Sequence, residues 1–163
     1  MIPELFRKLL RKGRPNRTSI GSDGWEIDAP QAFPVFLRSL PSLFDADSLL
    51  YLEDTDTPPP ILGFLREHET GDKARIPGGT LFPKPNVFYV PITTESVDGL
   101  ASLLESTQGA PVPTHVHVND SAGLALQWYD ASAGDPMLVR ASVDAGRIIA
   151  FCERIGSSHR RRG

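Results

Sequence analysis

Residues 114–143 contain three runs that decide the fold: THVHV (114–118), LALQWY (124–129) and MLVRASV (137–143). Apolar and polar residues alternate in these runs, and polar or turn-forming residues separate them. Successive side chains on a β-strand point to opposite faces. The stretch therefore predicts an antiparallel meander of three strands with one buried face and one outer face.

The alternation assigns the side chains of this meander to its two faces. The buried face would hold Val116, Val118, Leu124, Leu126, Trp128, Met137, Val139 and Ala141. The outer face would hold His115, His117, Gln127, Tyr129 and Arg140, which we predict to be the ligand-binding residues. We expect this outer face to be open to solvent or to a partner.

The expected hairpin register places Val118 opposite Leu124 and brings Arg140 close to His117. A cation beside an imidazole disfavours protonation of the ring. A face of this composition suits a polar ligand or a partner protein. An ordinary half-exposed sheet surface is the alternative, because polar residues commonly occupy the outer face of an antiparallel sheet.

The two histidines also raise the question of a metal. His115 and His117 are two residues apart on one predicted strand, so both imidazoles project to the same side. Two imidazoles can bind zinc or another divalent metal when a third ligand joins them, and Asp120, His68 and Asp130 qualify by residue type. Two solvated surface histidines are the simpler interpretation. The sequence therefore predicts no cofactor, with a metal-dependent enzyme centred on His115 and His117 as the alternative.

The rest of the chain alternates helices with strands. Helical spacing of apolar residues predicts helices over 2–12, about 30–44, 59–68, 94–108 and 145–155, the last with a strand over 147–152 as the alternative. Strands are expected at 25–27, 48–53, 80–82 and 86–92. This order predicts a single α+β domain with a mixed sheet of about five strands, right-handed crossovers, and helices mainly on one face.

The chain of 163 residues suits one domain, and its ends differ from its body in charge. We expect a basic amphipathic helix and linker over 1–17, one α+β domain over 18–156, and a disordered basic tail over 157–163. Residues 1–17 carry six Lys and Arg side chains against one acidic residue, whereas acidic residues predominate in the body. The N-terminal helix would dock on the body, on a partner protein or on an anionic membrane surface. The acidic body argues against nucleic acid as a partner.

The remaining signals define a broad class of protein. One cysteine permits no internal disulfide, and the sequence has neither a membrane-spanning apolar run nor a secretory signal. We therefore expect a cytoplasmic protein. The common catalytic motifs, such as Gly-x-Ser-x-Gly and His-Glu-x-x-His, are absent. The sequence favours a soluble bacterial-type protein that acts as a non-enzymatic binding or protein-interaction module, with self-association through the outer face as one form of interaction.

Overall fold

The computed structural model describes residues 20–71 and 83–163. The strands within them are β1 (Gly24–Ile27), β2 (Leu49–Asp54), β3 (Asn86–Pro91), β4 (His115–Asp120), β5 (Gly123–Trp128), β6 (Met137–Arg140) and β7 (His159–Arg162). The helices are α2 (Phe33–Leu43), α3 (Pro59–His68), α4 (Thr94–Ser106) and α5 (Ala145–Ile155), with a short 3₁₀ turn at Ala131–Ala133. The predicted helix over 2–12 and the predicted strand at 80–82 lie outside the described residues.

The seven strands form one open sheet in the order β3-β2-β4-β5-β6-β1-β7, and every neighbouring pair is antiparallel. The prediction of an α+β fold is confirmed. The predictions of about five strands and of a mixed sheet are wrong. The helix α4 does join two strands that run the same way, β3 and β4, since both pair antiparallel with β2. However, β2 lies between them. The helix α5 joins β6 to β7 around β1 in the same manner.

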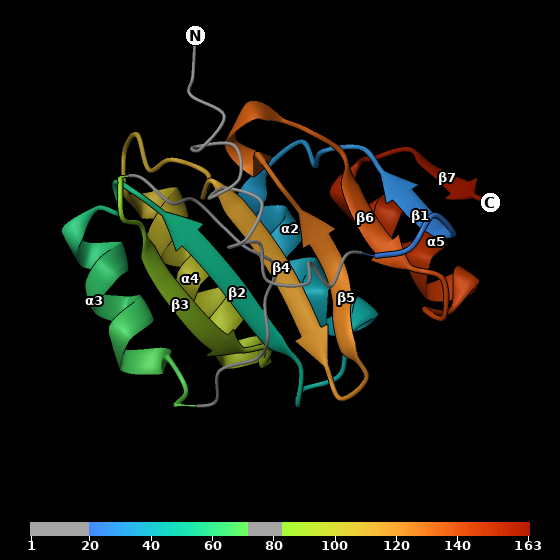
Figure 1. Cartoon of the computed structure of the whole chain (residues 1–163). Helices are drawn as coiled ribbons and strands as arrows, with labels where there is room; N and C mark the ends of the chain where they lie inside the picture. Colours follow the sequence, from blue (N-terminus) through green and yellow to red (C-terminus); the bar gives the residue numbers. More distant parts are fainter. Residues whose placement is uncertain (1–19, 72–82) are drawn as a thin grey trace, which may run out of the picture.

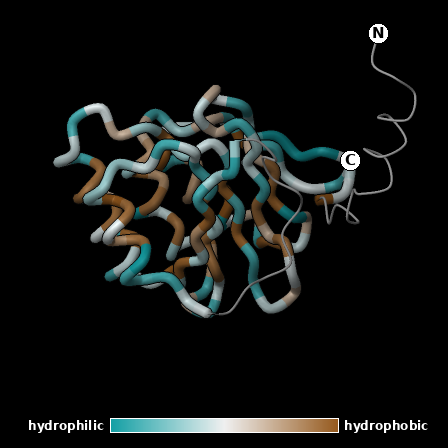
Figure 2. Tube along the Cα trace, turned by 60° about the vertical axis from the view of Figure 1, so that its left-hand side comes forward, coloured by the Kyte–Doolittle hydropathy of each residue, from teal (hydrophilic) through white to brown (hydrophobic). Residues whose placement is uncertain are grey.

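The helices α2, α4 and α5 lie behind the sheet in Figure 1, and α3 lies beside the edge strand β3. The core fills the space between these helices and the sheet. Trp128 of β5 meets Phe36 of α2 edge to face at 5.1 Å between ring centroids, and Phe36 meets Phe151 of α5 at 6.0 Å. Apolar residues gather toward this interior in Figure 2, whereas the peripheral loops are largely polar. Among the helices of the described residues, none is long and apolar enough to cross a bilayer.

Most side chains of the meander lie on the predicted faces, but Leu124 pairs with Asn119 and is not part of the main hydrophobic core, and Ala141 follows the end of β6 at Arg140. The register of the β4–β5 hairpin also differs from the predicted one. Val116 pairs with Trp128 and His117 pairs with Gln127, so the imidazoles point away from the tryptophan side of the sheet. Val118 lies opposite Leu126 instead of Leu124, because a bulge between Val118 and Asn119 shifts the pairing toward the turn. A bulge places two residues of one strand against one of its partner, which alternation alone does not reveal.

The helix predicted over 145–155 is present with the same bounds, and the alternative strand over 147–152 is not formed. The side chain of Asp144 caps α5 by accepting a hydrogen bond from the backbone N–H of Arg147. Gly156 ends the helix with a φ of 67°, a left-handed conformation that suits glycine.

The tail over 157–163, predicted to be disordered, instead contains strand β7. It pairs antiparallel with β1, and the N–H of Asp28 donates to the carbonyl of Ser158 just beyond the paired residues. The composition of the tail suggested disorder, but β1 leaves a row of backbone hydrogen-bonding groups that the tail satisfies. The Arg161 guanidinium also stacks over the Trp25 ring, 4.9 Å from its centroid.

Candidate functional site

The face of the sheet opposite the helices carries a cluster of five polar and aromatic side chains, which we call the polar cluster. It consists of Tyr51, Glu53, His115, His117 and Tyr129. The register places Tyr51 of β2 directly opposite His117 of β4, and Glu53 opposite His115. Because paired residues share a face, adjacent strands bring these side chains together although more than 60 residues of sequence separate them.

The polar cluster is buried, contrary to the expectation of an open face. His117 is fully buried and Glu53 is 1% exposed, while Tyr51 and His115 are 5% and 8% exposed. Lateral ring packing contributes to this burial. The His117 ring stacks on Tyr51 at 5.3 Å between centroids, and Tyr129 meets it edge-on at 4.9 Å. Water is therefore largely excluded from the centre of the cluster.

Backbone hydrogen bonds hold both imidazoles. The N–H of Trp128 donates to His117 Nδ1 at 3.2 Å, and the N–H of Asp130 donates to His115 Nδ1 at 3.0 Å. A neutral imidazole that accepts at Nδ1 carries its proton on Nε2. His117 therefore presents an Nε2–H donor on the polar face.

The carboxylate of Glu53 lies within this group. It accepts a hydrogen bond from the Tyr51 hydroxyl at 2.5 Å, and its Oε1 lies 3.9 Å from His115 Nε2. The pKa of Tyr51 is raised above its ordinary value. The larger cause is the burial of the hydroxyl, and the second is its hydrogen bond to Glu53. The pKa of His117 is lowered to about 3, mainly by burial of the ring and to a smaller extent by the neighbouring His115. At neutral pH the cluster thus presents a protonated Tyr51 and a neutral His117.

Two buried donors on this face have no acceptor within the described part of the chain. They are His117 Nε2 and Asn119 Nδ2. Both residues belong to β4 and alternate with the core residue Val118, so both point to the polar face. A buried donor without a partner costs about 1–3 kcal/mol, so such pairs mark positions where an acceptor is missing.

The predicted site residues are only partly brought together. Tyr129 contacts both imidazoles, with 5.2 Å between its ring and that of His115. Gln127 lies beside His117 in the register and accepts a hydrogen bond from the N–H of Ile20 at 3.2 Å. Tyr129 is thus a member of the polar cluster and Gln127 borders it, on the face that alternation predicts.

Arg140 is not part of the polar cluster. Its two terminal nitrogens donate to the carboxylate of Asp120 at 2.5 and 3.1 Å, and its Nε donates to Ser142. The expectation that Arg140 lies beside His117 is therefore wrong. Arg140 instead forms an ion pair with Asp120 at the turn of the β4–β5 hairpin. The physical reason is the bidentate match between a guanidinium and a carboxylate, which orients the side chain toward the turn.

Three members of this face, Tyr51, Glu53 and Asn119, are not among the residues predicted from the sequence. The sequence predicts residues 48–53 only as a buried strand. The alternation of Tyr51 and Glu53 with Leu50 and Leu52 is a signal that could have placed them on a polar face. Their position beside the histidines could not be read in that way, because it depends on which strand pairs with β4.

The metal hypothesis gains no support. Across residues 20–71 and 83–163, no group of three or more His, Cys, Asp or Glu side chains is arranged to hold a metal ion. His115 and His117 each use Nδ1 to accept a backbone N–H, and their ring centroids are 6.4 Å apart. Asp120, offered as a third ligand, is instead engaged by Arg140.

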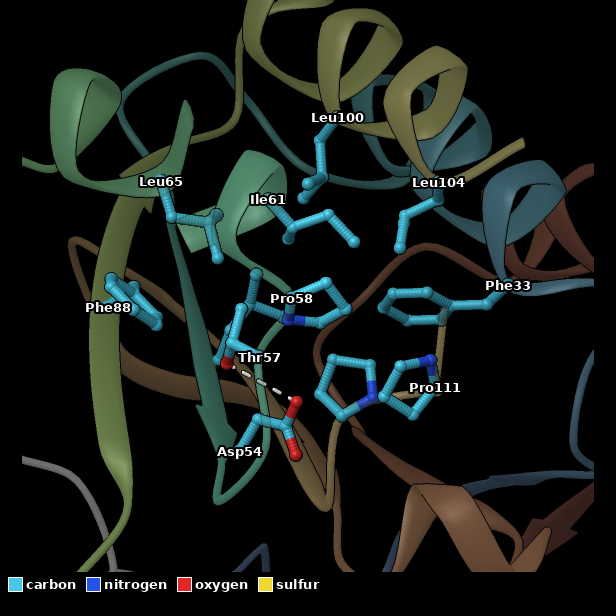
Figure 3. A pocket seen from close by; sticks show the side chains of 12 residues that line it. Phe33, Asp54, Thr57, Pro58, Ile61, Leu65, Phe88, Leu100, Leu104 and Pro111 are labelled. Carbon is cyan, nitrogen blue, oxygen red and sulfur yellow. Dashed lines mark hydrogen bonds between the residues drawn. The ribbon is translucent and has the colours of Figure 1, made fainter. Parts of the chain in front are cut away.

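A second feature is an apolar pocket between α3, α4 and the sheet, shown in Figure 3. Phe33, Ile61, Leu65, Phe88, Leu100 and Leu104 line it. At its polar side, Thr57 donates a hydrogen bond to Asp54 at 3.3 Å. Its free volume of about 20 Å³ is room for roughly one water molecule, so it does not compete with the polar cluster as a site.

Comparison with known proteins gives no assignment: no protein-family model, no curated protein and no solved structure matches this chain. The function of the protein is therefore inferred from the geometry of the polar cluster.

Proposed function

We propose that the protein is a non-enzymatic binding module that recognises its ligand through the polar face of the sheet. The observation that carries this proposal is the pair of buried donors at His117 Nε2 and Asn119 Nδ2, for which the described residues supply no acceptor. Because both donors are buried, the side chains around them must move aside before the carbonyl or carboxylate oxygens of a ligand or partner segment complete both hydrogen bonds. The aromatic rings of Tyr51 and Tyr129 would contribute apolar contact area beside them.

The spacing between His117 and Asn119 along β4 limits which acceptor groups can bind both donors. Residues two apart on a strand are separated by roughly 6.6 Å along it, so the two donors suit two acceptor groups about that far apart. Because His117 is neutral near pH 7, it donates as an uncharged N–H and does not require an anion. Neutral carbonyl groups, such as those of an amide or a peptide, therefore fit the pair of donors best.

The protonation states of the side chains favour binding over catalysis. A general acid or base works best when its pKa lies near the working pH, and the pKa of His117 is far below it. The lone cysteine, Cys152, is buried in α5, and burial raises the pKa of its thiol to about 11, which suppresses the reactive thiolate. We therefore favour a binding or interaction module, and the expectation of a cytoplasmic location comes from the sequence alone.

The N-terminal basic segment stays a separate expectation. Residues 1–17 lie outside the described residues, and their suggested contact with a partner protein or an anionic membrane surface is proposed on sequence alone. Self-association through the polar face is a further form of the same proposal, in which a second copy supplies the acceptors.

The binding proposal can be tested with small acceptor probes. Acetamide and N-acetylglycine amide, which carry one and two amide carbonyls, are titrated into the nitrogen-15-labelled full chain. The two-carbonyl probe should shift the His117 side-chain and Asn119 amide signals more strongly. The variant His117→Phe should lose the response, whereas His68→Phe on α3, which changes a histidine away from the cluster, should keep it. Unchanged His117 and Asn119 signals with both probes at millimolar concentration would refute the proposal.

A further inference from the structure

Among the strands of residues 20–71 and 83–163, β7 is an arginine-rich edge of the sheet. It is the last of these strands in the order of the sheet, and its one partner among them is β1. Its sequence is HRRR, and His159, Arg160 and Arg161 are exposed. An edge strand presents a row of backbone N–H and C=O groups that can pair with a further strand.

The two edges of the sheet differ. At the opposite edge, the carbonyl of Tyr89 in β3 already accepts a hydrogen bond from the N–H of Thr70 at 2.8 Å. That strand also ends in Pro91, which has no N–H to offer. At β7, the described residues supply backbone partners only on the side of β1. An added strand would therefore pair more readily at β7.

The positive charge of the β7 edge determines which kind of partner strand can bind there. Arg160 and Arg162 lie on the same face as Glu26, which pairs with both of them. Arg161 lies on the other face, where it stacks over Trp25 and donates to the carbonyl of Ala141. The carboxylate of Glu26 thus faces two guanidinium groups and Arg161 adds a third on the other face, so this edge of the described residues keeps a net positive charge.

A second copy of this chain is a poor partner for the edge. Pairing β7 with another β7 would place arginines beside arginines, and like charges on neighbouring strands repel each other. A strand with alternating acidic residues would instead place carboxylates beside Arg160 and Arg162 on one face or beside Arg161 on the other. Backbone pairing supplies the affinity in such complexes, and the side chains supply the specificity.

We propose that β7 binds an extended acidic segment of a partner protein as an additional antiparallel strand at the edge of the sheet. This interaction goes beyond the ligand proposed for the polar face, because it uses the backbone edge of β7 and the arginine side chains. It also gives a role to the arginine-rich tail that composition alone suggested to be disordered.

The test uses the full chain and three synthetic heptapeptides with blocked ends. The first alternates glutamate and valine. The second has the same sequence with N-methyl groups on alternate residues, which removes the N–H groups of one edge but keeps the charge. The third alternates lysine and valine. Dissociation constants are measured by calorimetry, and the backbone amide signals of β1 and β7 are followed by NMR.

We expect the acidic peptide to bind and to shift the amide signals of residues 159–162. The N-methylated and the basic peptides should bind at least about tenfold more weakly, because each lacks one of the two contributions. The paired variant Arg160→Gln/Arg161→Gln should lose most of the affinity. The control Arg154→Gln, which removes an exposed arginine from α5, should bind as the wild type does.

The amide signals of residues 24–27 reveal whether the paired variant releases β7 from β1. In that case the affinities of the three peptides for the wild-type chain test the proposal on their own. Absence of binding by the acidic peptide overturns the proposal. Equal affinity for the N-methylated peptide overturns it as well, since charge alone would then suffice. Tighter binding of a single-stranded oligonucleotide than of the acidic peptide, or dimerisation of the chain through β7, would also reject an acidic strand as the partner.

Discussion

The hydroxyl of Tyr51 donates a hydrogen bond to the carboxylate of Glu53, two residues further along β2, and both side chains are buried on the polar face. Side chains two apart on a strand point the same way, so this contact is local. The consequence is not local, because the same carboxylate lies 3.9 Å from His115 Nε2 on the neighbouring strand. The pair Tyr51–Glu53 therefore links β2 to the imidazoles of β4.

Removal of the Tyr51 hydroxyl should destabilise the fold. In Tyr51→Phe, the buried carboxylate of Glu53 loses a donor, and we expect the free energy of unfolding to fall by about 1–3 kcal/mol. Tyr89→Phe is the matched control, because it removes the same atom from the neighbouring, half-buried ring, whose contact with Tyr51 is edge to face. Urea denaturation of both variants measures the difference. Equal losses in the two variants would contradict the role of the Tyr51–Glu53 bond.

Acid should destabilise the protein through His117. The folded-state pKa of His117 is about 3, below the unfolded value of 6.5. The unfolded state therefore binds the extra proton first, and stability is lost as the pH falls from about 6.5 toward about 3. The slope from this one group is about 1.4 kcal/mol per pH unit at most.

The His117→Gln variant isolates this contribution. Its stability should change less than that of the wild type between pH 6.5 and pH 4, while His159→Gln, which replaces an exposed histidine in β7, should follow the wild-type curve. Denaturant titrations at several pH values provide the curves. Parallel curves for wild type and His117→Gln would show that the imidazole does not become protonated on unfolding.

The tyrosines should titrate unequally in alkali. Burial is the main cause that raises the pKa of both Tyr51 and Tyr89. For Tyr51, the hydrogen bond to Glu53 raises the pKa further. The folded protein keeps these phenolic protons when the unfolded chain has lost them, so stability should fall as the pH rises above about 10. Ultraviolet difference spectra of the native protein should show ionisation of Tyr51 only at higher pH than in the unfolded chain. Ionisation of all three tyrosines together at the ordinary pKa would contradict this expectation.

The start of α4 is closed by a reciprocal capping box. Thr93 accepts from the N–H of Ser96, and Ser96 accepts from the N–H of Thr93. Thr93→Ala should cost about 0.5–2 kcal/mol of stability, whereas Thr94→Ala, at an exposed neighbouring position, should change it by less than about 0.5 kcal/mol. Thermal unfolding of both variants compares them. A larger loss for Thr94→Ala would show that the cap contributes little.

Deletion of β7 should expose the edge of β1. Truncation after Gly156 removes the pairing with residues 24–27 and the hydrogen bond from the Asp28 N–H to the Ser158 carbonyl. We expect the melting temperature to fall by several degrees, roughly the effect of 1–2 kcal/mol for a chain of this size. Removal of Gly163 alone serves as the control. An unchanged melting temperature after the longer deletion would restore the interpretation of the tail as disordered.

The local parts of the fold could be predicted because they follow from neighbours in sequence. Apolar spacing and the cap at Asp144 located α5, and period-two alternation placed His115 and His117 on the face opposite Trp128. The position of Arg140 could not be predicted in the same way. It depends on a bulge after Val118 and on the distance to Asp120, neither of which leaves a periodic signal.

The sequence by itself determined most of the helices and strands of the described residues, with β7 as an exception, and most of the side chains of the meander that share a face, because both depend on the repeat of a few residues along the chain. Only the tertiary structure decided that β2 lies between β3 and β4, that Tyr51 and Glu53 meet the two histidines, and that the basic tail completes the edge of β1. Strand order arises from backbone hydrogen bonds between distant segments. Those bonds are the same for every residue type except proline, so side-chain identity alone carries little record of which strands pair.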